Sequence, residues 1–215
     1  REIVKEMAKL GFFGCIAPEK YGGNESGYLG ATVMTEEIAR VSPSWGLPFN
    51  LQMNSIQSVL LNFGTEAQRE RWIPKLINAD LLGCFAITEA NSGSDVASMK
   101  SAAQEVEDGF ILNGTKMWIS GIPVADLGIV YAFTDRAAKH RGISAFLVDM
   151  HAPGVTQKAI ETKLGLFCAP TGEIVFENVK LPKDSLVGQK GDGFKICMSM
   201  LDSTRLSCAA RAVGV

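Results

Sequence analysis

The stretch FAITEANSGSD (Phe85–Asp95) decides how the chain is divided, because it begins as an apolar strand and ends in small polar residues without any Lys or Arg. Gly93 has no side chain and lies between Ser92 and Ser94, so backbone N–H groups and two hydroxyls can approach one ligand closely. Such a group of donors favours an anion. The alternative is a serine-rich turn that only closes the strand.

Helical periodicity fills the chain before this stretch. Helices are expected at residues 1–10, 29–41 and 47–63, with a loop at 18–27 and an interruption at Ser42-Pro43-Ser44. Thr65 and Gln68 have the spacing of a capping box before a further helix that carries Trp72, and Pro74 is expected to limit its length.

Short β-rich runs follow, at residues 83–87, 110–112, 117–120, 127–133, 143–150 and 174–176. Asp108-Gly109 and Asn113-Gly114 are both hairpin-type dipeptides, and we expect at least one of them to form a tight turn. Helical spacing resumes near Gly193. The pattern predicts an α+β multidomain chain: an N-terminal helical domain at 1–80, a middle antiparallel β-barrel or sandwich at 81–190, and the start of a C-terminal helical bundle at 191–215.

Composition excludes several function classes. A formal net charge of -2 without a basic stripe argues against nucleic acid as a partner. No apolar run approaches the ~20 residues of a membrane span. The five cysteines lack CxxC spacing and only two histidines are present, so we expect reduced thiols and no metal site.

Three further features suggest a ligand or have a plain alternative. Glu89 is interpreted as a solvated loop charge. Trp118 and Ser120, in KMWISG (Lys116–Gly121), would share one side of a strand and suit a flat heterocycle, although a tryptophan on a sheet is also a common core residue. Asp202 and Arg205 lie three residues apart on a helix, where they either pair with each other or contact a long phosphorylated ligand.

Together these segments resemble the acyl-CoA dehydrogenase family. The similarity runs through GFFGCIAPEKYGG, ITEANSGSD, KMWIS, KLGLFCAPTGEIVFENVKLP and GFKICMSMLDSTR, so it covers essentially the whole chain. Because the chain starts without Met inside a helical pattern and stops inside another, we expect it to be a fragment. The resemblance implies most of an N-terminal helical domain, a middle β-domain and the opening of a C-terminal helical domain.

The resemblance also implies FAD as cofactor. It places the flavin against Trp118, with Thr88 bonding the pyrimidine side of the ring, Ser120 donating near N5, and Ser94 near the pyrophosphate and the pantetheine. The full set of implied cofactor-binding residues is Phe85, Ala86, Ile87, Thr88, Gly93, Ser94, Trp118, Ile119 and Ser120. The substrate-binding residues implied are Ser94, Asp202 and Arg205.

The implied reaction is α,β-dehydrogenation of an acyl-CoA, with electrons passed to an electron-transferring flavoprotein. Some branches of the family place the basic Glu where this chain has Thr204, which cannot act as a base at neutral pH. We therefore expect the base beyond Val215 and an inactive isolated fragment. The alternatives are an acyl-CoA oxidase or flavin monooxygenase of the same fold, or an inactive fragment that binds CoA or a partner.

The polar residues within 47–63, namely Gln52, Asn54, Ser55 and Gln57, either line the acyl pocket or form an exposed helix face. The first reading favours a short, branched, cyclic or carboxylate-bearing acyl group. A glutaryl group would call for an Arg near residues 50–55, and none is there. The resemblance implies a homotetramer when full length, and location in a prokaryotic cytoplasm or, alternatively, the mitochondrial matrix.

Overall fold

Helices occupy the chain up to Ile77 in the computed structural model, which describes residues 1–215. The expected helices are present, but α3 begins at Pro43, so only Ser42 separates it from α2. The bounds are α1 Glu2–Lys9, α2 Gly27–Val41, α3 Pro43–Asn50, the π-helical η3 Leu51–Gln57, α4 Ser58–Phe63 and α5 Glu66–Ile77, with short 3-10 turns η1 Phe12–Gly14 and η2 Glu19–Tyr21.

The capping box at the start of α5 is confirmed. The Thr65 hydroxyl accepts a hydrogen bond from the Gln68 N–H, and the Gln68 side chain accepts from the Thr65 N–H. Pro74 does not limit the helix as expected, because α5 continues to Ile77. Pro74 removes one N–H donor from α5, and the helix continues past it without that hydrogen bond.

The π-helical segment η3 is buried along its whole length. Gln52 explains how an amide is accommodated there: its NH₂ group donates to the carbonyls of Leu76 (2.7 Å) and Leu81 (2.6 Å), and its Oε1 accepts from the Gly83 N–H (3.1 Å). Asn54, Ser55 and Gln57 are buried too. The interpretation of these polar residues as an exposed helix face is therefore wrong.

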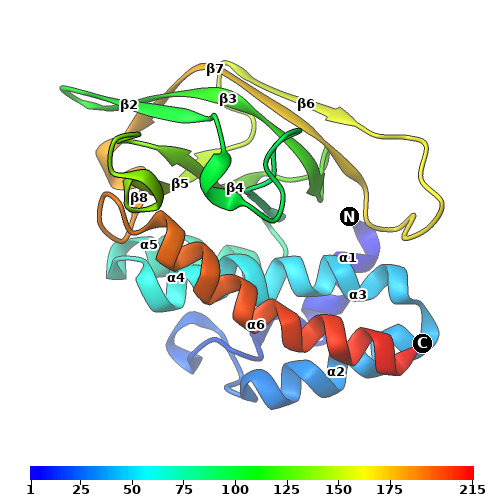
Figure 1. Ribbon diagram of the computed structural model, residues 1–215. Helices are drawn as coiled ribbons and strands as arrows, with labels where there is room; N and C mark the ends of the chain where they lie inside the picture. The colour runs from blue at the N-terminus through cyan, green and yellow to red at the C-terminus, as the bar shows by residue number, and fades with distance from the viewer.

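Eight strands form one mixed sheet that lies above the helices in Figure 1, in the order β6-β7-β3-β2-β4-β5-β8, with β1 also paired to β4. Most neighbours are antiparallel, as expected, but β4 runs parallel to both β1 and β2. The bounds are β1 Gly83–Ala86, β2 Ala102–Val106, β3 Gly109–Ser120, β4 Leu127–Phe133, β5 Ile143–Asp149, β6 Val155–Ala159, β7 Thr171–Pro182 and β8 Leu186–Val187, with 3-10 turns η4 Val96–Ser98, η5 Lys139–Gly142 and η6 Lys183–Ser185.

The two hairpin-type dipeptides behave differently. Val106 pairs with Gly109, so Asp108-Gly109 belongs to the tight hairpin between β2 and β3. Asn113-Gly114 does not turn the chain; it lies inside β3 at a register shift. A Cβ on Gly114 would come within 2.2 Å of the Ser101 Oγ, so glycine is needed there for close approach.

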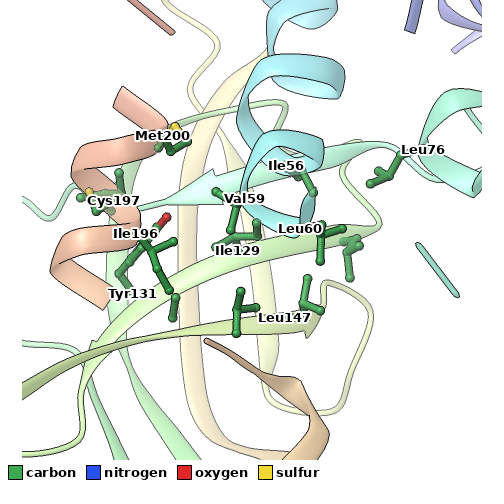
Figure 2. Packing of buried hydrophobic residues seen from close by; sticks show 14 of the residues in the cluster. Ile56, Val59, Leu60, Leu76, Ile129, Tyr131, Leu147, Ile196, Cys197 and Met200 are labelled. Atoms are coloured by element: carbon green, nitrogen blue, oxygen red, sulfur yellow. The ribbon is translucent and has the colours of Figure 1, made fainter. Parts of the chain in front are cut away.

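The largest of three hydrophobic clusters joins the N-terminal helical part, the sheet and the last helix. Its 22 buried residues come from the N-terminal helices, from the sheet and from helix α6, which spans Gly193–Gly214. Figure 2 shows Ile56 and Leu60 of the helices facing Ile129 and Leu147 of the sheet, with Ile196 of α6 closing the side. None of the helices is long and apolar enough to cross a lipid bilayer.

Candidate functional site

The polar loop after β1 is tied to strand β3. The Met117 N–H donates to the Thr88 carbonyl at 2.9 Å, which places the loop directly beside the KMWISG segment. Within the loop, Glu89 and Ser92 exchange backbone hydrogen bonds of 2.9 and 3.1 Å, and the Ser92 hydroxyl donates to the Asp95 carbonyl. The serine-rich turn expected from the sequence is therefore present, and the loop and the KMWISG segment lie side by side.

Beneath this surface lies a buried ion pair between Glu89 and Lys116. The Lys116 Nζ is fully buried and donates to Glu89 Oε1 at 2.9 Å and to the Ile87 carbonyl at 3.0 Å. The same carboxylate oxygen accepts from the Ser101 N–H (2.9 Å) and hydroxyl (2.6 Å), and Oε2 accepts from the Lys100 N–H. The interpretation of Glu89 as a solvated loop charge is therefore wrong.

The pKa values of the pair follow from these contacts. Burial lowers the pKa of the Lys116 ammonium, and the Glu89 carboxylate opposes that shift. Burial by itself raises the pKa of Glu89, but Lys116 and the hydrogen bonds from Ser101 and Lys100 outweigh it, so the carboxyl pKa lies below its ordinary value. Both carboxylate oxygens of Glu89 already accept hydrogen bonds, and the ion pair holds the loop on β3.

Trp118 presents its ring outward from the sheet. Its side chain lies at a β-bulge with φ of 62°, in the left-handed region, and the residue is 61% exposed. A core role for this tryptophan is therefore wrong. Exposing so large an apolar ring carries a free-energy cost, and a bulge that turns a side chain out of a sheet is a recurrent feature beside ligand sites.

Gly93 stands at the exposed tip of the loop and is not required by the backbone. Its φ lies outside the left-handed region, and a Cβ placed on it would meet no atom within 4 Å. The N–H groups of Gly93 and Ser94 donate to no other group of the chain. The hydroxyls of Ser94, Thr88 and Ser120 also make no hydrogen bond within it. These donors and acceptors remain available to a ligand.

The remaining predicted site residues divide into two groups. Ala86, Ile87 and Ile119 are buried in the cores, and Phe85 packs against the larger one, so these four residues offer a ligand mainly their backbone. Asp202 and Arg205 lie on α6 as an exposed ion pair of 3.8 Å. Exposed pairs of this length contribute little to stability, and no hydrogen bond links either residue to the Phe85–Ser94 loop or to the Trp118 bulge.

Thr204 is buried on α6, and its hydroxyl donates to the Leu201 carbonyl at 2.9 Å. The Glu89–Lys116 pair leaves no periodic signal in the sequence, because its two opposite charges lie far apart in the chain. The one local clue is that Lys116 directly precedes the apolar residues Met117–Ile119.

A cavity of about 530 Å³ lies elsewhere, between α5 and the sheet. It contains none of the predicted site residues. Trp118 and the Gly93 loop are candidates for a ligand site because of the exposed ring and the unpaired backbone donors. They do not line this cavity.

Comparison with known proteins gives the relationship of the whole chain. The description "Acyl-CoA dehydrogenase, N-terminal domain" matches residues 1–80, and "Acyl-CoA dehydrogenase, middle domain" matches residues 84–179. A glutaryl-CoA dehydrogenase of Desulfococcus multivorans is 44% identical over 100% of this chain and 56% of that protein.

Solved structures agree with this relationship. The complex of a glutaryl-coenzyme A dehydrogenase with glutaryl-CoA superposes with a TM-score of 0.96 at 44% identity, over 100% of this chain and 55% of that one. A glutaryl-CoA dehydrogenase from Mycobacterium smegmatis in complex with FADH2 gives 0.92 at 31% identity, over 99% and 53%. The chain thus spans about half the length of the relatives it matches, and it belongs to the acyl-CoA dehydrogenase family.

Proposed function

We propose that the full-length protein binds FAD against Trp118 and dehydrogenates an acyl-CoA between Cα and Cβ. The observation that carries this proposal is the exposed Trp118 ring beside a loop whose Gly93 is explained by no contact within the chain. A planar ring system and an anionic diphosphate together match those two features. When bound, FAD supplies the two-electron acceptor for the hydride that leaves Cβ.

The chain's own residues would hold the cofactor. Trp118 would offer its face to the ring, and the unpaired hydroxyls of Thr88 and Ser120 would hydrogen-bond its edge. The N–H groups of Gly93 and Ser94 would bind the diphosphate without a cationic side chain, as backbone donors do in other anion sites. The buried Glu89–Lys116 pair keeps the loop carrying these donors in place on β3.

Residues of this chain also bear on proton removal from Cα. Glu89 cannot serve as the base, because both of its oxygens already accept hydrogen bonds. Thr204 carries no carboxylate. We therefore propose that a carboxylate outside these 215 residues removes the proton. Asp202 and Arg205, exposed on α6, would contact the CoA portion of the substrate.

The proposed acyl group is short, branched, cyclic or carboxylate-bearing. It would lie along η3, where buried amide and hydroxyl groups interrupt the apolar surface that a long hydrocarbon chain prefers. The relative from Desulfococcus multivorans is named for glutaryl-CoA, an acyl thioester with a distal carboxylate. An electron-transferring flavoprotein is the proposed acceptor, and a homotetramer the proposed assembly.

The test uses the full-length protein purified without detergent or reductant. We expect a yellow protein whose flavin absorbance is bleached anaerobically by acyl-CoA thioesters and restored by an electron-transferring flavoprotein. Oxygen uptake in place of flavoprotein reduction would identify an oxidase instead. A colourless protein that takes up no added FAD would overturn the proposal.

A further inference from the structure

Lys163 lies in the connection between β6 and β7, where its side chain is half-buried. Its ammonium group donates to the Leu166 carbonyl at 3.0 Å, to the Ala169 carbonyl at 2.5 Å and to the Thr171 hydroxyl at 3.2 Å. A lysine ammonium has three N–H donors, so all of them are used within the chain. Because the three acceptors are uncharged oxygens, Lys163 holds the connection together through hydrogen bonds alone.

The connection has little apolar packing of its own. Leu164 and Phe167 are exposed, and Ala169 is the one buried residue between positions 161 and 170. Leu166 has a φ of 54°, in the left-handed region that a leucine rarely adopts. The hydrogen bond from Lys163 to the Leu166 carbonyl therefore supports an unfavourable backbone conformation at a place where burial cannot do so.

The connection continues directly into β7, which lies beside β3 (Figure 1). Thr171 pairs with Ser120 in this ladder, and the Pro170 carbonyl accepts from the Gly121 N–H at 2.7 Å. The bulge at Trp118 interrupts the ladder, and only two residue pairs lie beyond it. The position of Ser120 therefore depends on the start of β7, to which Lys163 is bonded.

The backbone between Lys163 and the end of β3 is closely packed. A Cβ on Gly172 would lie 2.4 Å from the Lys158 carbonyl oxygen and 2.5 Å from the Ile122 Cγ2. Gly121 has a φ of 91°, and a Cβ on it would lie 3.4 Å from the Gly83 carbonyl oxygen. Because tightly packed groups transmit a displacement instead of absorbing it, a shift at the start of β7 should move the end of β3.

We propose that Lys163 is a positioning residue for the Ser120 hydroxyl and, through it, for the flavin. The inference rests on the proposed function and adds a residue that acts without touching the cofactor. The Ser120 hydroxyl makes no hydrogen bond within the chain, so its direction depends on where the backbone of β3 lies. Hydrogen bonds weaken steeply when distance and angle change, so a displaced Ser120 would hold the flavin less well.

The experiment uses Lys163→Met in the full-length holoenzyme, which removes the three donors and keeps an unbranched side chain. We expect anaerobic flavin reduction by saturating butyryl-CoA to slow about tenfold, with a shift of the visible flavin spectrum. KM should change less than about threefold, because the residues proposed to hold the thioester are untouched. Lys158→Met is the matched control, since Lys158 is an exposed lysine on β6, and it should change neither the rate nor the spectrum.

Ser120→Ala completes a double-mutant cycle. If Lys163 acts through Ser120, adding Lys163→Met to Ser120→Ala should slow flavin reduction by less than about twofold more. Effects that multiply in the double variant, or a single Lys163→Met variant that behaves like Lys158→Met, would overturn the inference. Thr171→Val removes one of the three acceptors and carries the same cycle, with a smaller slowing, if Lys163→Met does not fold. An unmodified protein that binds no FAD would instead overturn the proposed function.

Discussion

Lys116 and Glu89, from the middle of one strand and the loop after another, form an ion pair of 2.9 Å from which solvent is almost excluded. The pair links β3 to the loop that carries Gly93 and Ser94. The pair therefore couples the stability of the fold to the position of this loop.

Lys116→Met should destabilise the protein by about 3–5 kcal/mol, because it leaves the Glu89 carboxylate buried without its cation. Urea unfolding followed by circular dichroism measures this change. Lys190→Met is the matched control, since Lys190 pairs with Glu105 at an exposed site and should change stability little. Similar losses for the two variants would contradict a special role for the buried pair.

The pH dependence of stability should include a contribution from Glu89. Its folded pKa is depressed, so its stabilising effect is complete above the ordinary glutamate pKa of about 4.3 and is lost as the pH falls through the folded pKa. Unfolding free energies of the unmodified protein and of Glu89→Gln should differ at neutral pH and converge in acid. A constant difference across that range would show that the charge of Glu89 is not responsible.

Trp118→Ala should weaken FAD binding about tenfold while leaving the melting temperature of the FAD-free protein nearly unchanged. The reason is that the ring is 61% exposed and contributes little to the core. Fluorescence titration of the FAD-stripped full-length protein checks the affinity. A large drop in melting temperature with unchanged FAD affinity would show that Trp118 has a structural role instead.

Gly93→Val tests the loop by adding bulk where the fold tolerates it. No atom lies within 4 Å of the added Cβ, so we expect stability to change by no more than about 0.5 kcal/mol. FAD affinity should fall at least about tenfold, because the diphosphate could no longer approach the backbone. Gly165→Val, at another open glycine, should affect neither quantity.

Cys84 and Cys197 should resist alkylation in the native protein. Burial raises the pKa of each thiol to about 12, which removes the reactive thiolate at neutral pH. Cys168 is exposed and serves as the reactive reference. Peptide mapping after brief iodoacetamide treatment distinguishes them, and native-state labelling of Cys84 or Cys197 at the rate of Cys168 would contradict the expectation.

Local patterns predicted much of the fold. The strand at 127–133 and the capping box at Thr65 came directly from hydrophobic runs and side-chain spacing. Strand β2 was missed, because Ala102–Val106 is short and contains a single β-branched residue, and its three consecutive exposed residues give no alternating signal. Periodicity also treated Phe110–Leu112 and Met117–Ser120 as two strands, since it cannot recognise a bulge inside one long strand.

The site was predictable only as far as it is local in sequence. Small polar residues around Gly93 mark the loop, and the family resemblance marks Trp118. The Glu89–Lys116 pair and the close approach of Gly114 to Ser101 join residues from different segments through tertiary packing. No pattern within a single segment encodes such pairs, and each required the folded chain to be seen.

The 22-residue core links the unfolding of the parts of the chain to one another. Its side chains come from helices before the sheet, from the sheet and from α6, and Gly83 of β1 is pressed against Ile56 so closely that a Cβ would lie 2.2 Å from the isoleucine Cδ1. Regions that share buried contacts lose those contacts when either region unfolds, which favours cooperative unfolding. The N-terminal and middle domains, although they match separate family descriptions, should therefore denature in one cooperative transition.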